Sequence, residues 1–134
     1  MIIFVERLIM KHFLVISKGT EYIRIPADQL VYISADGNYS EIVTHDNRKR
    51  IVTIQMGQLA DMITNQLGEA GEDFARIGRS LIINRDFLHS IDSAKQQIVL
   101  SDCCSCYYEL KAPREALAGF KAFIEEVDKN ERGR

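Results

Sequence analysis

The sequence predicts a mainly β fold in which short antiparallel strands surround one short central helix, and an amphipathic helix closes the chain. Three observations lead to this fold class. Short runs rich in Val, Ile and Tyr fill the first 55 residues, one helical repeat interrupts them, and a longer helical repeat comes at the end. Because 134 residues suit one domain and are few for two, we expect a single domain.

The predicted strands of the first half are separated by residues that form turns. Gly, Pro, Asn and Asp gather at residues 18–20, 26–28, 36–38 and 46–47. The strand-like runs beside them are residues 12–17, 21–26, 30–34, 39–44 and 49–55. Strands joined by such short turns predict a β meander.

The central helix is predicted at residues 56–68. Its apolar residues recur at helical spacing, and Gly68 is a natural C-terminal stop. An acidic loop, residues 69–73, leads back into strand-like sequence, which continues as a hairpin and a further strand within residues 87–111. The sheet therefore resumes after the helix.

The closing helix is predicted to begin after Pro113. Leu117, Phe120, Ile124 and Val127 lie on one face of this helix, as the spacing of an amphipathic helix requires. We expect the folded domain to span residues 12–127, with an N-terminal extension at residues 1–11 and a frayed tail at residues 128–134.

Composition and charge narrow the function classes. Apolar residues make up 46% and charged residues 27% of the chain, which is typical of a globular protein. A formal net charge of -2 argues against a protein that coats nucleic acid over its whole surface, but it is compatible with a local basic face. The distribution of charge therefore matters more than its sum.

The apolar start of the chain does not predict a membrane anchor. Glu6, Arg7 and Lys11 interrupt it, whereas a spanning helix needs about 20 apolar residues. No signal-type cleavage pattern follows. We expect a cytoplasmic protein that does not associate with membranes.

No motif predicts an enzyme. Neither a G-x-G-x-x-G nor a GK[ST] phosphate-binding pattern occurs, and no potential nucleophile has a base and an orienting group near it in the sequence. We therefore predict no catalytic residues and no bound cofactor.

The cysteines and histidines do not predict a metal site. Cys103, Cys104 and Cys106 are too close together for a disulfide framework, so we expect reduced thiols. A structural zinc site needs two separated pairs of ligands, and the second pair is missing. The three histidines follow no metal-binding pattern, and each is expected on the surface or an edge strand: His12, His45 and His89.

Three segments carry polar or basic residues that call for a partner. In "FARIGRSLIINRDFLHSI", three arginines lie within an apolar run, and arginine is costly to bury without a partner. The turn at residues 36–38 delivers Tyr39 and Ser40 to the start of the next strand. The turn at residues 46–50 carries Arg48, Lys49 and Arg50. Each turn, considered alone, is more typical of a solvated hairpin end.

Together, the three segments resemble the LytTR DNA-binding domain of bacterial transcription regulators. The first part of the resemblance is "LVYISADGNYSEIVTHDNRKRIV", which is followed by the helix and by the arginine segment. The family pattern there, F-x-R-I-x-R-S-x-x-x-N, is matched by Phe74, Arg76, Ile77, Arg79, Ser80 and Asn84. The resemblance covers residues from about 12 to 127 and ends with a strand, Arg114 and the terminal helix.

The resemblance implies an elongated β fold that inserts loops, and no recognition helix, into successive major grooves of double-stranded DNA. Arginine can contact guanine O6 and N7 with both ends of its guanidinium group, and hydroxyl groups can contact a base edge or a phosphate. The base-reading residues implied are Tyr39 or Ser40, Arg79 and Arg114. The phosphate-contacting residues implied are Asn38, Ser80 and Lys95, with Arg85, Lys49 and Arg50 as further candidates.

The roles of several residues stay open at this point. Arg85 could equally be a plain surface charge, and Arg76 could be an ion-pair partner. Asn84 could be a turn or cap residue. The sequence also departs from the family pattern at Gly78, where the family has histidine, and at Pro113, where it has serine. Pro113 removes a backbone N–H that could have met a phosphate.

Two readings of function follow. The first is a sequence-specific transcriptional regulator that binds repeated promoter sites as two copies, that is, as a homodimer on DNA. The alternative is a protein-interaction module on a LytTR scaffold with weak or lost DNA binding. Only about 11 residues precede the first matching strand, so we expect a stand-alone domain without a receiver domain.

Overall fold

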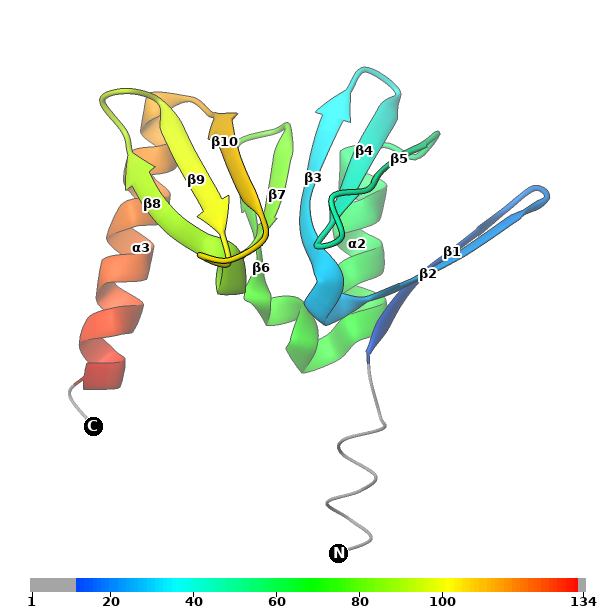
Figure 1. The fold of residues 1–134 in the computed structure, drawn as a ribbon, viewed down its shortest axis with the longest axis horizontal. Coiled ribbons are helices and arrows are strands. Elements are labelled where there is room, and N and C mark those ends of the chain that lie inside the picture. Colours follow the sequence, from blue (N-terminus) through cyan, green and yellow to red (C-terminus); the bar gives the residue numbers. More distant parts are fainter. Residues whose placement is uncertain (1–11, 133–134) are drawn as a thin grey trace, which may run out of the picture.

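The computed structural model describes residues 12–132, so the extension predicted at residues 1–11 lies outside the described residues. Within residues 12–132 the fold is mainly β, as predicted, with three antiparallel sheets and two α-helices (Figure 1). The helices are α2 (Met56–Leu67) and α3 (Arg114–Arg132). Neither these nor any other helix in the described part of the chain is long and apolar enough to cross a membrane.

The largest sheet has five strands in the order β5-β4-β3-β7-β6. It consists of β3 (Leu30–Asp36), β4 (Tyr39–Thr44), β5 (Lys49–Val52), β6 (Phe74–Ile77) and β7 (Leu81–Asn84). The two smaller sheets are formed by β1 (Phe13–Lys18) and β2 (Glu21–Pro26), and by β8 (Leu88–Asp92), β9 (Gln97–Ser101) and β10 (Tyr107–Lys111). Short 3-10 helices connect them: η1 (Ala27–Gln29), η2 (Gly68–Asp73) and η3 (Arg85–Phe87).

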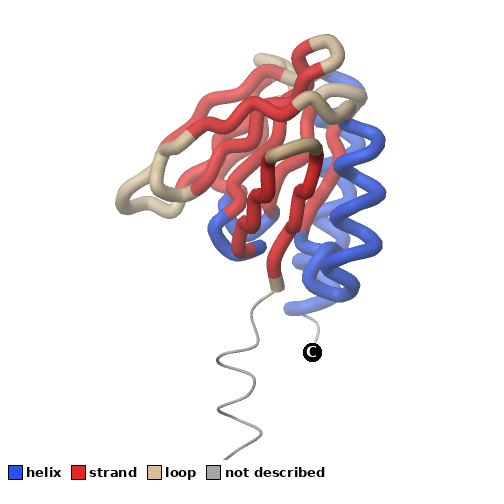
Figure 2. Tube along the Cα trace, turned by 90° about the vertical axis from the view of Figure 1, so that its right-hand side faces the viewer, coloured by secondary structure: helices blue, strands red, loops and turns tan. Residues whose placement is uncertain are grey.

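The five-stranded sheet is the middle layer, and its inner strands β3 and β7 are buried on both faces. One face packs with the β1–β2 hairpin and α2 around Leu14, Ile33 and Leu59. The other face packs with the three-stranded sheet and α3 around Val43, Ile98 and Leu117. Figure 2 shows both helices on the same side of the molecule, with the strands on the other. Two cores on either side of one sheet explain why β3 begins with the apolar run LVYI and why β7 reads LIIN.

A β-bulge in β3 sets which residues enter each core. The register between β3 and β4 shifts between Leu30 and Tyr32. Strand residues normally alternate between faces, but Val31 and Tyr32 both pack into the second core because the bulge adds a residue there. Ile33 then returns to the first core.

The two largest departures from the predicted boundaries are at the ends of β5 and α3. β5 ends at Val52, before the predicted end at residue 55, and the backbone carbonyls of Thr53 and Ile54 instead accept bonds from side chains of Lys18 and Ser40. α3 continues through residues 128–132, which were predicted to be a frayed tail. The helix can continue there because no Gly or Pro lies within residues 128–132.

Candidate nucleic-acid interface

Four connecting segments lie along one edge of the molecule, at the top in Figure 1. We call this the turn edge, and define it as residues 36–39, 78–80, 94–96 and 113–114. Backbone contacts hold the segments in place. The Ala35 N–H donates to the Ser80 carbonyl at 2.9 Å, and the Ala112 N–H donates to the Gln96 carbonyl at 3.2 Å. The turn edge therefore combines segments that are far apart in the sequence.

The β6–β7 turn places Arg79 near the middle of this edge. Gly78 has a φ of +64°, a left-handed conformation that residues with a side chain rarely adopt. The turn lines a groove of about 740 Å³ together with the end of β3, the end of β10 and the start of α3. Arg79 is exposed, and no carboxylate in the described residues lies within 4.0 Å of its guanidinium group.

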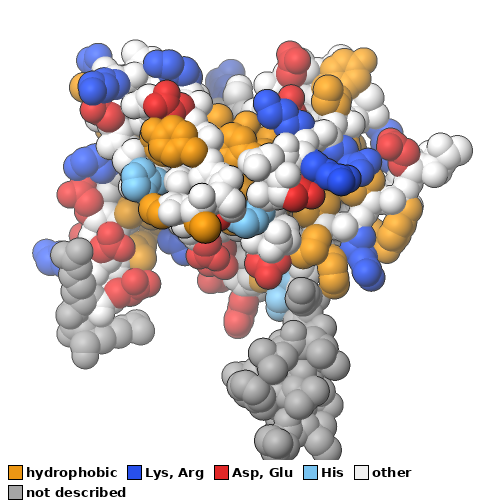
Figure 3. All heavy atoms as spheres, viewed as in Figure 1, with side chains coloured by type: hydrophobic (Ala, Val, Ile, Leu, Met, Phe, Trp, Pro, Cys, Tyr) orange, Lys and Arg blue, Asp and Glu red, His pale blue; other side chains and the backbone are white. Residues whose placement is uncertain are grey.

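Arg114 and Lys95 lie together at the end of the turn edge that is formed by residues 94–96 and 113–114. Arg114 is the first residue of α3, and its Nη2 donates to the Ala94 carbonyl at 3.4 Å. That bond fixes one of five guanidinium donors and leaves the others unpaired within residues 12–132. Lys95 is exposed in the same β8–β9 turn. In Figure 3, Lys and Arg side chains gather along this upper left margin of the molecule.

The β3–β4 turn presents Asn38 and Tyr39 but hides Ser40. Tyr39 is 50% exposed, whereas Ser40 is fully buried and its hydroxyl donates to the Ile54 carbonyl at 2.6 Å. The prediction that Ser40 reads bases is therefore wrong, because neighbouring residues of a strand point to opposite faces. Asn38 is exposed, and its Oδ1 accepts a bond from the Gln55 side chain at 3.3 Å.

Lys49 and Arg50 lie away from the turn edge. Lys49 pairs with Val43 and Arg50 pairs with Ile42, at the end of β4 opposite Tyr39. At about 3.3 Å per residue, that separation is roughly 10–13 Å along the strand. Both line a groove of about 690 Å³ between β2 and the β4–β5 hairpin, with Arg24 and Arg48. The structure does not bring these cations together with Arg79.

The other residues of the arginine segment have structural surroundings. Asn84 is buried, and its side chain accepts from the Asp86 N–H at 3.0 Å and donates to the Leu30 carbonyl at 2.9 Å. Of the turn and cap roles considered for Asn84, the structure therefore shows the cap. Arg85 follows β7 at the end opposite Ser80, and its side chain is only 25% exposed. Its Nη2 lies 4.0 Å from the Asp73 carboxylate, and its guanidinium carbon lies 5.8 Å from the centre of the Phe123 ring. A phosphate contact by Arg85 is therefore not supported.

Arg76 has no ion-pair partner in residues 12–132. Its side chain is exposed, and its hydrogen bond within these residues runs from Nη2 to the Arg79 carbonyl at 3.5 Å. The ion-pair role considered for Arg76 is not found. Its place beside the Arg79 turn instead adds positive charge next to the turn edge.

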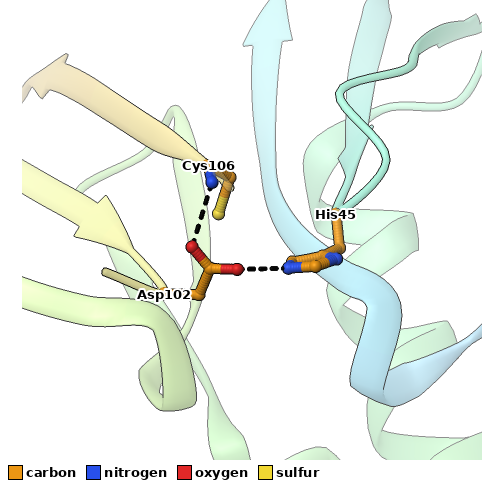
Figure 4. Close-up of side chains that lie close together, drawn as sticks. All are labelled: His45, Asp102 and Cys106. Carbon is orange, nitrogen blue, oxygen red and sulfur yellow. Dashed lines mark hydrogen bonds and ion pairs between the residues drawn. The ribbon is translucent and has the colours of Figure 1, made fainter. Parts of the chain in front are cut away.

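A cluster that no sequence pattern indicated joins the two larger sheets. His45, from the β4–β5 turn, lies with Nε2 2.5 Å from Asp102 Oδ2, in the β9–β10 loop (Figure 4). The backbone N–H of Cys106, the His45 ring and the backbone N–H of Cys104 hold the pKa of Asp102 well below its usual range. Burial raises the pKa of the Cys106 thiol. His45 and Asp102 are 57 residues apart, so no local motif connects them.

Cys103, Cys104 and Cys106 form no disulfide within the described residues, and their reduced state stays a prediction. Cys103 and Cys104 are exposed and Cys106 is buried. Cys103 Sγ lies 3.7 Å from the His89 ring.

Comparison with known proteins gives a family match and a structural match. The family model of the LytTr DNA-binding domain matches residues 20–125. The structure is similar to one described as the LytTr DNA-binding domain of a putative methyl-accepting/DNA response regulator from Bacillus cereus, with a TM-score of 0.56 and 14% identity, covering 85% of this chain and 97% of that one. At this identity the likeness shows a shared fold. No curated protein matches the sequence.

Proposed function

The chain belongs to the LytTR DNA-binding domain family, and we propose that it is a transcriptional regulator that reads double-stranded DNA in successive major grooves with its turn edge. In this proposal Arg79 and Arg114 contact bases, Tyr39 contacts a base edge or a phosphate, and Asn38, Ser80 and Lys95 contact phosphates. Two copies bind repeated sites on the promoter.

The observation that supports this assignment best is the unpaired state of Arg79 and Arg114. Within residues 12–132 neither arginine has a carboxylate within 4.0 Å. An exposed guanidinium that is not held by an acid can present its donors to guanine O6 and N7, and a good bidentate contact of this kind discriminates by about 1–3 kcal/mol. Phosphate contacts around such a residue fix its register on the duplex.

Charge segregation supports the same edge. The chain has a net charge of -2, but acidic side chains are more frequent lower on the face shown in Figure 3 than along the upper left margin. A basic edge on an acidic molecule orients the protein toward the phosphate backbone and repels it in other orientations. Lys49 and Arg50 lie outside the turn edge, and we assign them to flanking phosphates that a bent or longer site would bring near.

Selection of bound duplexes from a random pool tests the proposal. We expect an enriched motif that contains guanines and occurs as two spaced repeats, because each copy would read its own half-site. A pool that stays random after repeated rounds at low salt would contradict sequence-specific binding. Enrichment of a single unrepeated motif would support sequence-specific binding but contradict the binding of two copies.

A further inference from the structure

The cluster of His45, Asp102 and Cys106 has a composition that the proposed DNA contacts do not explain. One side-chain nitrogen, one oxygen and one sulfur lie within 4.8 Å of one another. His45 follows β4 at the end opposite Tyr39, so the cluster lies away from the turn edge. Figure 4 shows the three side chains directed toward a shared space between the five-stranded and three-stranded sheets.

We propose that His45, Asp102 and Cys106 bind a zinc ion that joins the five-stranded sheet to the three-stranded sheet. The sequence alone does not predict a metal site, because a second pair of ligands is missing from it. The fold adds one ligand from a second segment, because His45 lies 57 residues away from Asp102 and in a different sheet. A zinc ion held by both segments would cross-link the two sheets, with three protein ligands and an open fourth position.

The three donors suit zinc better than calcium or magnesium. Thiolate, imidazole and carboxylate are all ordinary zinc ligands, whereas the hard cations take oxygen donors almost exclusively. With three protein ligands, the fourth position would hold water. Water can reach it because the side chains of His45 and Asp102 are 32% and 21% exposed, while Cys106 closes the inner side.

The loop around Asp102 already orients its carboxylate for this role. Asp102 Oδ1 accepts from the backbone N–H groups of Cys104, Ser105 and Cys106 at 2.8–3.0 Å. These bonds leave Oδ2 directed at His45, and Ser105 Oγ supports it with a bond of 2.8 Å. Hydrogen bonds that fix a ligating group in this way raise metal affinity.

Small side-chain movements would complete a tetrahedral site. Bonds of about 2.0–2.3 Å place the donors of a zinc centre about 3.3–3.8 Å apart. The His45–Asp102 pair, now at 2.5 Å, would open by roughly 1 Å, and the widest pair, now within 4.8 Å, would close by roughly 1 Å. Binding exchanges the Cys106 thiol proton for the cation, so the thiol becomes the thiolate that zinc requires.

Titration of the reduced, metal-free full chain with Co²⁺ and then Zn²⁺ tests the site. We expect equimolar Co²⁺ to produce a thiolate-to-cobalt charge-transfer absorption, Zn²⁺ to abolish it by displacement, and Zn²⁺ to raise the thermal unfolding midpoint. His45→Gln and Cys106→Ser should each lower affinity by at least about tenfold, since even changes outside the ligand set cost about 10- to 100-fold.

Two controls separate this site from adventitious binding. A Cys103→Ser/Cys104→Ser double variant should keep both the absorption and the zinc-dependent stabilisation, and His12→Gln should behave like the unchanged chain. Circular dichroism checks that the variants fold. If Cys106→Ser does not fold, the result for His45→Gln decides. The proposal is overturned if no charge-transfer band forms, or if the band survives Cys106→Ser and His45→Gln but is lost in the double variant. Neither result depends on whether the turn edge binds DNA.

Discussion

Gly78 and Pro113, the two positions that depart from the family pattern, lie against each other across the turn edge. A Cβ placed on Gly78 would be 3.7 Å from Pro113 Cδ, which is ordinary van der Waals contact. Gly78 thus has room for a side chain, but its φ of +64° disfavours one. The two departures are therefore one local feature: a tight, left-handed turn packed on a proline that begins the connection to α3.

Gly78→Ala should destabilise the fold by about 1–2 kcal/mol because of its backbone conformation, not because of a clash. Gly119→Ala is the matched control. Gly119 lies inside α3, and a Cβ added to it would meet no atom within 4 Å, so Ala there should stabilise by up to about 1 kcal/mol. Urea unfolding measures both. Equal free energies of unfolding for Gly78→Ala and the unchanged chain would show that the turn adopts another conformation.

Ser40→Ala should destabilise the fold without changing base preference. Removing the hydroxyl leaves the buried Ile54 carbonyl without its 2.6 Å partner, which costs about 1–3 kcal/mol. Tyr39→Ala, at the neighbouring exposed position, should do the reverse and weaken DNA binding with little loss of stability. Urea unfolding and a binding assay on the selected duplex compare the two. A change of sequence preference in Ser40→Ala would restore the role that its burial excludes.

Asn84→Ala should destabilise the fold by about 1–3 kcal/mol, because it leaves the buried Leu30 carbonyl without a donor and removes the cap on the Asp86 N–H. DNA affinity measured well below the unfolding midpoint should be unchanged. A stable variant with weakened DNA binding would instead place Asn84 in the interface.

Lys95→Ala should weaken binding about equally to all duplexes. A phosphate contact carries no sequence information, and its loss lowers the slope of log affinity against log salt by about 1. Lys121→Ala is the control, since Lys121 is paired with Glu125 at 2.8 Å on the exposed side of α3. The same loss of slope in both variants would mean that overall charge, not contact at the turn edge, determines the effect.

Much of the fold could be predicted from the sequence because its signals are local. The runs of Val, Ile and Tyr with Gly, Asn and Asp between them define strands and turns directly, and the helical repeat after residue 55 defines α2. The order of strands in the sheets could not be predicted from these signals, since pairing such as that of β3 with β7 depends on contacts across about 50 residues.

The candidate site was predictable in part. Arg79, Arg114 and Lys95 lie on the turn edge, whereas Ser40 is buried and Arg85 lies near Asp73, away from that edge. The DNA contacts of Arg79, Arg114 and Lys95 stay a prediction. The alternation of strand residues could have decided between Tyr39 and Ser40, because adjacent residues face opposite sides. The burial of Arg85 could not have been predicted, because its neighbours Asp73 and Phe123 come from η2 and α3. The cluster of His45, Asp102 and Cys106 could not have been predicted either, because its residues come from segments that are far apart in the sequence.

The most direct test of the turn edge is a base-by-base affinity profile of the unchanged chain and of Arg79→Ala on the selected duplex. Each base pair is substituted in turn, and the loss of affinity is measured at fixed salt. We expect Arg79→Ala to lose about 1–3 kcal/mol of discrimination at one guanine-containing position and to keep the preferences elsewhere. An unchanged profile, with full preference at every position, would contradict base reading by Arg79.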